Sequence, residues 1–305
     1  MLLENKIIII IKNFNQLNCS FLKGFLIYLK LKPSFNNLIL IDYDNKIKLY
    51  ENKKFIKKEL EFKNNIILFN KFLPDINTLK ILKKNNNILI HEIIDFFYNK
   101  KYNNYKEYFE EYTINNTFIF DKIIVNSNHM KNQLINYFNN IDVIYHQYDH
   151  RIKLKNNKIN KIYYIGLKNK LELSDKIINE CNIKIMNNSK IKKYILNAFS
   201  CIQVCFIKKN NNLFDTYTST KLATAIITNS IFICNKIPVF VELLGNDYEF
   251  YCDDENNLIN IIEKAKITFN DEIKYDQYLQ KYSYLKNKLD YKNLLINYKN
   301  LFNKS

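Results

Sequence analysis

Short, continuous apolar runs recur along the chain with amphipathic stretches between them, and this alternation limits the possible folds more than any other feature. In the first half the runs lie at 6–11, 38–41, 66–69, 88–90, 122–125 and 142–145. Such runs are typical of strands buried on both faces of a parallel sheet. The stretches between them, at 16–31, 75–84, 103–112 and 129–138, have helical patterning. The sequence therefore predicts repeated β-α units.

The segment 149–160, DHRIKLKNNKIN, interrupts this pattern because it is polar, basic and unpatterned, which indicates a linker. After it the alternation restarts, with strands expected at 161–166, 183–186, 201–207 and 231–234. Helices are expected at 171–181, 190–197, 216–230, 240–245 and 258–268, and the tail 275–301 indicates one or two closing helices. We expect an α/β protein with two Rossmann-like β/α/β domains, 1–155 and 156–305, facing a cleft that holds the ligand.

The composition limits the kinds of partner that the protein is expected to bind. The net charge of +16 favours nucleic acid or an anionic membrane, but Arg151 is the only arginine, and arginine is the residue that reads guanine and phosphate bidentately. We therefore do not expect nucleic acid as the partner and keep a peripheral contact with anionic lipid as an option. With three glycines and three prolines, the chain also has no glycine-rich phosphate loop.

The cysteines predict a reducing compartment. Most of the six lie inside apolar runs such as FSCIQVCFI, which indicates buried, reduced thiols, and none has zinc-binding spacing. The N-terminal apolar run, IIIII, is too short to span a bilayer and lacks a signal-peptide cleavage pattern, so we interpret it as a first buried strand. The expected location is the cytoplasm, with the cytoplasmic face of a membrane as a peripheral site.

Several segments, in this order, resemble the GT-B glycosyltransferases. FDKIIVNSNHMKNQLINYFNNIDVIYHQYD, followed by a linker and KIYYIG, resembles the crossover between the two domains of that family. TSTKLATAIITNSIFICNKIPVFVELLG resembles its donor-binding segment, and NNNILIHEIIDFF resembles the strand and loop that face the acceptor. The resemblance covers most of the chain from about Ile66 to Cys252. It implies an enzyme that moves a sugar from a nucleotide-diphosphate sugar to a glycan, lipid or other acceptor.

The resemblance implies a donor site around Lys221. Ser219, Thr220 and Lys221 would bring a hydroxyl group, backbone amides and an ammonium group to one helix start, where a diphosphate gains negative charge as the sugar leaves. The alternative is an ordinary N-cap with a solvated lysine. Glu242 would accept hydrogen bonds from donor hydroxyls, or else complement the dipole of its helix from the first turn. Gly166 would let a nucleotide approach the backbone, or else form a tight turn.

On the acceptor side, His91, Glu92 and Asp95 follow a strand in HEIIDFF. His91 or Asp95 would take the acceptor proton in an inverting transfer or brace the sugar in a retaining one, the alternative being loop residues that cap the next helix. Gly24 lies in FLKGFLIYLKL, where close helix packing is the first interpretation and an acceptor-side role the second. His146 and His150 flank the linker and are interpreted as hinge residues.

Departures from the family pattern leave other functions open. Thr216 and Thr224 stand where many retaining members have two glutamates, Asn229 replaces a helix-ending glycine and Ile231 a proline. These changes motivate the alternative of a non-catalytic GT-B-like protein that binds an anionic membrane or nucleic acid. A third option, the GT-A fold, would use Asp42 and Asp44 as metal ligands, but turn acids are the preferred interpretation. We expect neither a metal nor another cofactor.

Overall fold

The chain forms two compact units, which are described separately. The computed structural model describes residues 1–12, 20–43, 47–71, 74–94, 119–166, 168, 171–207 and 217–304. Unit 1 comprises Met1–Ile144 and Leu294–Ser305, and unit 2 comprises Tyr145–Asn293. The domain boundary expected after residue 155 falls inside a strand of unit 2, and the last residues of the chain, expected in the second domain, belong to unit 1.

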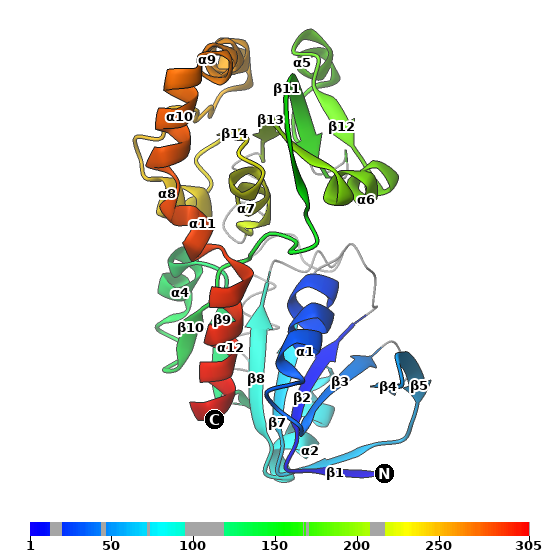
Figure 1. Ribbon diagram of the computed structural model, residues 1–305. Helices are drawn as coiled ribbons and strands as arrows, with labels where there is room; N and C mark the ends of the chain where they lie inside the picture. Colours follow the sequence, from blue (N-terminus) through cyan, green and yellow to red (C-terminus); the bar gives the residue numbers. More distant parts are fainter. Residues whose placement is uncertain are drawn as a thin grey trace. The chain divides into compact units, whose positions relative to one another are not determined.

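Unit 1 is built on an eight-stranded sheet in the order β10-β9-β8-β7-β2-β3-β4-β5, with β4 and β5 antiparallel at one edge and the other strands parallel (Figure 1). A separate parallel pair joins β1 and β6. The strands are β1 (Leu2–Glu4), β2 (Ile7–Ile11), β3 (Leu38–Tyr43), β4 (Ile47–Glu51), β5 (Lys54–Lys57), β6 (Glu61–Lys63), β7 (Ile66–Asn70), β8 (Ile88–Ile93), β9 (Lys122–Val125) and β10 (Ile141–Val143). Its helices are the π-helix η1 (Ser20–Phe25), α1 (Leu26–Leu31), α2 (Ile76–Lys84), α4 (Asn128–Leu134) and most of α12 (Tyr291–Lys304).

The central strand β2 is buried on both faces, which explains why its sequence is five consecutive isoleucines. Ile8 and Ile10 join the core that α2 covers, whereas Ile11 faces η1. A Cβ on Gly24 would lie 2.1 Å from Cγ2 of Ile11, so the close packing expected at this glycine is confirmed. After β3, the strands β4 and β5 form an antiparallel hairpin.

Unit 2 has a four-stranded parallel sheet in the order β12-β11-β13-β14. Its strands are β11 (Leu154–Ile165), β12 (Lys184–Met186), β13 (Ala198–Cys205) and β14 (Ile231–Cys234). Its helices are α5 (Asp175–Glu180), α6 (Asn188–Leu196), α7 (Thr220–Ile227), α8 (Pro238–Leu244), the 3-10 turn η5 (Glu255–Asn257), α9 (Leu258–Asn270), α10 (Glu272–Lys281) and α11 (Tyr284–Lys288).

Two expectations about these elements are wrong, and a third concerns residues outside the described ranges. The linker expected at 149–160 is wrong in its second half, because β11 begins at Leu154 and pairs with β13 there. The one or two closing helices are three, α10, α11 and α12, because the helix breaks after Lys281 and after Lys288. The helix expected at 103–112 lies outside the described residues.

Asparagine takes the place of glycine at the turns that precede the strands. Five strands, β2, β7, β8, β12 and β14, each begin two residues after an asparagine in the left-handed region, with φ between 50° and 57°: Asn5, Asn64, Asn86, Asn182 and Asn229. Asn229, which replaces a helix-ending glycine, follows the end of α7 in the left-handed conformation that such a glycine would adopt. Because asparagine tolerates this region better than other non-glycine residues, a chain with three glycines can still end its helices sharply.

This use of asparagine gives a stability prediction. Asn182→Ala is expected to destabilise the protein by about 1 kcal/mol, because alanine adopts a left-handed backbone only at a cost, while Asn182→Gly should match or exceed the wild type. The matched control is Asn179→Ala, which lies in the last turn of α5 and should be neutral or slightly stabilising. Urea unfolding followed by circular dichroism measures all three; an equal effect of both alanine variants would contradict the interpretation.

Two further predictions concern the cysteines and membrane-spanning segments. Cys181, Cys201, Cys205, Cys234 and Cys252 are free and buried, as their apolar surroundings indicate, and Cys19 lies outside the described residues. Burial raises the pKa of the Cys252 thiol to about 11, so it stays protonated near neutral pH. None of the helices in the described ranges is long and apolar enough to cross a membrane.

Candidate functional site

Lys221 lies in the first turn of α7, the helix that connects β13 to β14. Since this helix follows a strand of a parallel sheet, it begins at the carboxyl edge of that sheet, where ligands of open α/β sheets bind. Nζ of Lys221 donates a hydrogen bond to the carbonyl oxygen of Ile165, 2.6 Å away, at the end of β11. It also lies 4.2 Å from the centre of the Tyr164 ring. The lysine is therefore fixed against the backbone at the strand end.

Gly166 makes this close approach possible. A Cβ at this position would lie 2.5 Å from Nζ of Lys221 and 3.0 Å from the hydroxyl oxygen of Tyr164. The Tyr164 side chain is fully buried, and within the described part of the chain its hydroxyl has no hydrogen-bond partner. Burial raises the pKa of this hydroxyl, so it remains protonated. A buried polar group without a partner is costly, and it is often found where a ligand or water completes the site.

Ser219 and Thr220 contact the segment that opens unit 2. The Ser219 side chain is fully buried, and its hydroxyl donates to the carbonyl oxygen of His146 over 2.6 Å. It makes no side-chain cap bond at the start of α7, so the expected N-cap is wrong in this respect. Oγ1 of Thr220 lies 3.1 Å from Nδ1 of His146. The Ser219 hydroxyl thus holds the backbone of His146 against the helix start.

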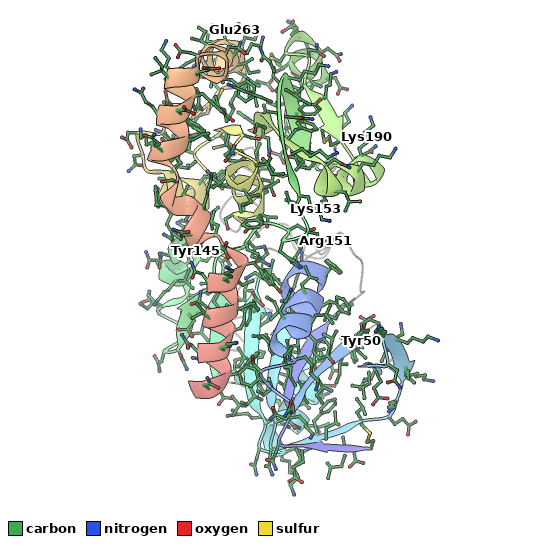
Figure 2. The ribbon with its side chains drawn as sticks, viewed as in Figure 1. Tyr50, Tyr145, Arg151, Lys153, Lys190 and Glu263 are labelled. Atoms are coloured by element: carbon green, nitrogen blue, oxygen red, sulfur yellow. The ribbon has the colours of Figure 1, made fainter. Side chains whose placement is uncertain are left out.

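Glu242 lies in the second half of α8, so the expectation that it begins its helix is wrong. The hydroxyl of Tyr145, a residue labelled in Figure 2, donates a hydrogen bond to Oε1 of Glu242. Nζ of Lys288 lies 4.7 Å from the centre of the Tyr145 ring. Burial is the main cause that raises the pKa of the Tyr145 hydroxyl, and the hydrogen bond to Glu242 raises it further. Tyr145 and His146 therefore connect α8 to the start of α7, and this two-residue bridge brings Glu242 into the same region as Lys221.

Sequence reasoning missed Tyr145, His146 and Tyr164 as parts of this site. His146 and His150 were interpreted as hinge residues, but His146 contacts Thr220, and the His150 ring stacks on Tyr291 with centroids 4.6 Å apart. The available signal was the position of YHQYDH directly after a strand, where parallel sheets collect functional side chains. Thr224, one of the two threonines in place of glutamates, donates its hydroxyl to the Thr220 carbonyl oxygen within α7, while Thr216 lies outside the described residues.

On the acceptor side, His91 is a buried residue of β8, and its ring lies 5.4 Å from that of Phe120. Burial lowers the pKa of His91 to about 3, so the ring is neutral at physiological pH and a weak base. Asp95 lies outside the described residues. The structure therefore places His91 under the surface of unit 1, in a different environment from the open loop that the sequence suggested.

Glu92, the neighbour of His91, belongs to a buried polar cluster in unit 1. Its carboxylate lies 3.1 Å from Nζ of Lys23 and accepts hydrogen bonds from the Tyr298 hydroxyl and the Asn70 amide, each over 2.7 Å. The Lys23 side chain is 0% exposed and that of Glu92 is 2% exposed. Lys23 comes from the π-helix η1, a rare element that often marks functional sites. The cluster joins η1, β7, β8 and α12, and the lysine was not predicted from the sequence.

The possible metal ligands are only partly within the described structure. Asp42 is a buried residue of β3, and Asp44 lies outside the described residues. In the described ranges, no group of three or more His, Cys, Asp or Glu side chains could hold a metal ion. The described residues therefore do not support the metal-dependent alternative.

With its two parallel-sheet units, the chain has the GT-B fold of nucleotide-sugar glycosyltransferases. It superposes over 99% of its length on 100% of Anabaena Alr3699/HepE, solved in complex with UDP and glucose, with a TM-score of 0.64 and 10% identity. A T4 phage BGT variant in complex with UDP-glucose gives a TM-score of 0.51 and 12% identity, over 97% of this chain and 99% of that one. A structure of the DNA-modifying enzyme β-glucosyltransferase gives 0.50 and 11%, over 96% and 98%.

At such low identity the likeness establishes the fold alone. No protein-family model matches the sequence, and no curated protein matches it either. The fold class expected from the alternation of strands and helices is therefore confirmed. The roles of individual residues depend on the geometry of the site and do not follow from this likeness.

Proposed function

We propose that the protein is a glycosyltransferase that moves a sugar from a nucleotide-diphosphate sugar to a glycan, lipid or other acceptor, without a bound metal. The observation that carries this proposal is the placement of Lys221 at the start of α7, against Ile165 and beside Gly166, at the carboxyl edge of the unit 2 sheet. The neighbouring fold in Anabaena was solved with UDP and glucose, which supports a uridine nucleotide as the first donor to test.

The chemistry of the transfer matches these groups. As the bond between the sugar and the diphosphate breaks, negative charge grows on the diphosphate, and fixed positive charge stabilises it. An ammonium group that is already held in place needs little reorganisation at that moment, and the first N–H groups of a helix have no partner within the helix. Lys221 and the first turn of α7 supply both. Gly166 leaves room beside the ammonium group, where any larger residue would displace it.

Other groups of the proposed site would orient the sugar. The Glu242 carboxylate can accept hydrogen bonds from neighbouring hydroxyls, and its contact with Tyr145 fixes its direction. On the acceptor side we assign the proton-accepting role to Asp95 in preference to His91. Burial disfavours the imidazolium that His91 would form on taking up a proton, whereas a carboxylate becomes neutral when it accepts one.

A second candidate function is a GT-B-like binding protein without catalysis, and one observation favours it. The hydroxyl groups of Ser219 and Thr224 are both engaged by the protein, with His146 and Thr220 respectively. In this candidate, Lys221 has a structural role only, and the basic surface would bind an anionic membrane. It predicts no stabilisation by nucleotide sugars and salt-sensitive binding to anionic vesicles.

A donor panel separates the two candidates. The full chain is incubated with UDP-glucose, GDP-mannose and CMP-sialic acid, and its melting temperature is recorded by circular dichroism. We expect one donor class to stabilise the protein, by about 2.7 kcal/mol at a concentration of 100 Kd. For the UDP and GDP donors, the free nucleoside diphosphate should stabilise the protein more than the nucleoside, because the proposed contacts are with the phosphates, and stabilisation by CMP-sialic acid alone would contradict a diphosphate donor.

The same panel is then run for turnover by detecting release of the nucleotide. Activity that persists in EDTA supports the metal-free proposal, whereas activity lost in EDTA and restored by Mg²⁺ or Mn²⁺ contradicts it. A melting temperature unchanged by every donor, together with binding to anionic vesicles, would replace the proposed enzyme by the second candidate.

A further inference from the structure

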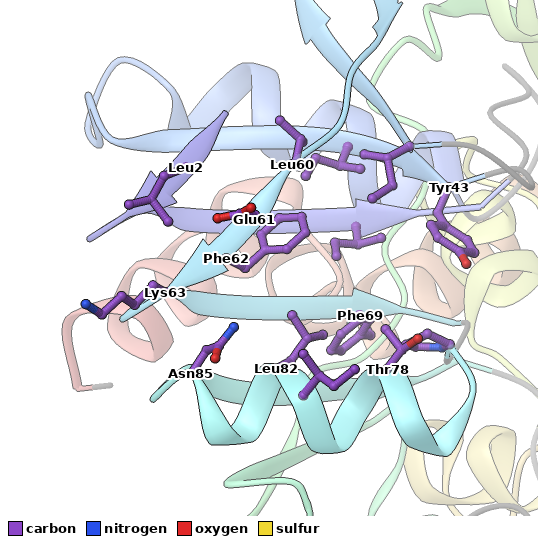
Figure 3. A pocket seen from close by; sticks show the side chains of 15 residues that line it. Leu2, Tyr43, Leu60, Glu61, Phe62, Lys63, Phe69, Thr78, Leu82 and Asn85 are labelled. Atoms are coloured by element: carbon purple, nitrogen blue, oxygen red, sulfur yellow. The ribbon is translucent and has the colours of Figure 1, made fainter.

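Unit 1 contains an apolar cavity of about 460 Å³, remote in sequence from every residue of the proposed donor site (Figure 3). Its floor is the sheet face that carries Ile10, Ile41 and Phe69. One wall is α2 and the other is β6 with the residue before it, and all of the lining residues belong to unit 1. This volume lies within the range of small-molecule binding sites, which is about 300–1,000 Å³.

The cavity exists because of an irregular crossover. Parallel strands of one sheet, such as β3 and β7 on either side of β2, are usually connected through a helix that covers the sheet, but here the connection runs through β4, β5 and the three-residue β6. A short strand covers less apolar surface than a helix does. The apolar side chains of β2, β3 and β7 are therefore covered by α2 on one side only, and an open apolar space remains beside it.

The size and lining of the cavity restrict what can occupy it. An apolar lining does not hold ordered water, which needs two or more polar partners. A peptide helix about 10–12 Å wide would fill the whole volume with a single turn. The residues of α2 that line the cavity run from Thr78 to Asn85, so the cavity extends for about 10 Å along that helix. An elongated, apolar space of this size fits a hydrocarbon chain.

Exposure shows where the cavity opens. Leu2 and Ile81 both line it and are 53% and 60% exposed, whereas the floor residues Ile41 and Phe69 are each 1% exposed. Lys63 and Asn85 lie at the same end as Leu2, away from Tyr43 and Phe69 (Figure 3). A ligand with a polar head would therefore place the head at this end, beside the Lys63 ammonium and the Asn85 amide, and its apolar tail against the sheet. The Glu61 carboxylate also lines the cavity.

We propose that this cavity binds the hydrocarbon tail of a single-chain amphiphile, either a free fatty acid or a neutral lipid. The site does not depend on the donor site of unit 2, so it would remain if the proposed glycosyltransferase function failed. The exposed apolar pair Leu2 and Ile81 forms its entrance, and Lys63 contacts the head group.

The test uses cis-parinaric acid, a fatty acid whose fluorescence rises in an apolar environment. Titration of the full chain should give saturable binding with one site. Laurate and monolaurin, which share a tail, then compete for that site. Stronger displacement by laurate identifies a free fatty acid as the preferred source and should be lost in Lys63→Gln, while stronger displacement by monolaurin identifies a neutral lipid.

Ile81→Glu places a carboxylate at the entrance and should weaken binding about tenfold, because a charge next to the tail is poorly solvated and apolar contact is lost. The matched control is Ile135→Glu, an isoleucine at the end of α4 that is 55% exposed and lies outside the cavity lining. Since both residues are exposed, both variants should fold, which circular dichroism checks. Absence of saturable binding, or equal affinity in both variants, would overturn the proposal.

Discussion

Lys221→Met is expected to lower the rate of sugar transfer by about 10²- to 10³-fold, the usual cost of removing one fixed group that stabilises charge in a transition state. Methionine keeps the length and apolar stem of lysine but has no charge, so the contact with the Tyr164 ring changes little in shape while the ammonium group disappears. The measurement is kcat with the donor that the panel identifies. Because the proposed role concerns the leaving diphosphate, kcat should fall more than the affinity for the donor changes.

Two comparisons make this prediction specific. Lys176→Met removes one charge from an exposed side chain on α5 and should leave kcat unchanged. In Lys221→Met, the affinity for UDP should fall while that for uridine stays the same, because only UDP presents a diphosphate. Equal losses for UDP and uridine would indicate structural damage and would contradict the assigned role.

The second large effect concerns stability, at the buried pair Lys23 and Glu92. Lys23→Met and Glu92→Gln are each expected to destabilise unit 1 by about 3–5 kcal/mol, because each removes one member of a buried ion pair. The polar groups around the pair, the Tyr298 hydroxyl and the Asn70 amide, can solvate the Glu92 carboxylate but cannot neutralise it.

The double variant Lys23→Met with Glu92→Gln distinguishes charge from packing. It removes both charges and keeps an acceptor for Tyr298, so it should be more stable than either single variant. A sum of the two single losses would show that packing, and not the buried charge, dominates. The exposed pair Lys83 and Asp121 provides the control, since Lys83→Met should cost less than about 1 kcal/mol.

Hydrogen exchange detected by mass spectrometry localises the effect of the single variants. Amide protons of β7, β8 and α12 should exchange faster, because the cluster connects these elements, while unit 2 should keep its protection. The C-terminal helix contacts unit 1 through the Tyr298 hydroxyl and through the buried Phe302 ring, which packs against Phe35, so its last residues cluster with that unit although the sequence placed them in the second domain.

The strands could be predicted well because their signal is local. A run such as IIIII is typical of a parallel strand that is buried on both faces, as β2 is. The beginning of β11 could not be predicted, since its polar residues pair with β13 only through backbone hydrogen bonds that carry no side-chain pattern. The breaks between the closing helices were missed for a related reason, because the Tyr and Leu spacing continues across them.

The candidate site was predictable in part. Ser219, Thr220, Lys221 and Gly166 do come together, because a parallel sheet brings strand ends and helix starts to one edge. The direction of each side chain was not predictable. Ser219 turns toward His146, and Glu242 is reached through Tyr145, contacts between residues more than 70 positions apart.

The sequence by itself determined the α/β class and the positions of most strands along the chain, since burial on two faces is recorded in local residue type. Only the tertiary structure decided that Lys221 contacts Ile165, that Lys23 is buried against Glu92, and that a cavity remains beside α2. Those features depend on which distant residues meet, and a local pattern carries no information about the partner of a charge or the space between two elements.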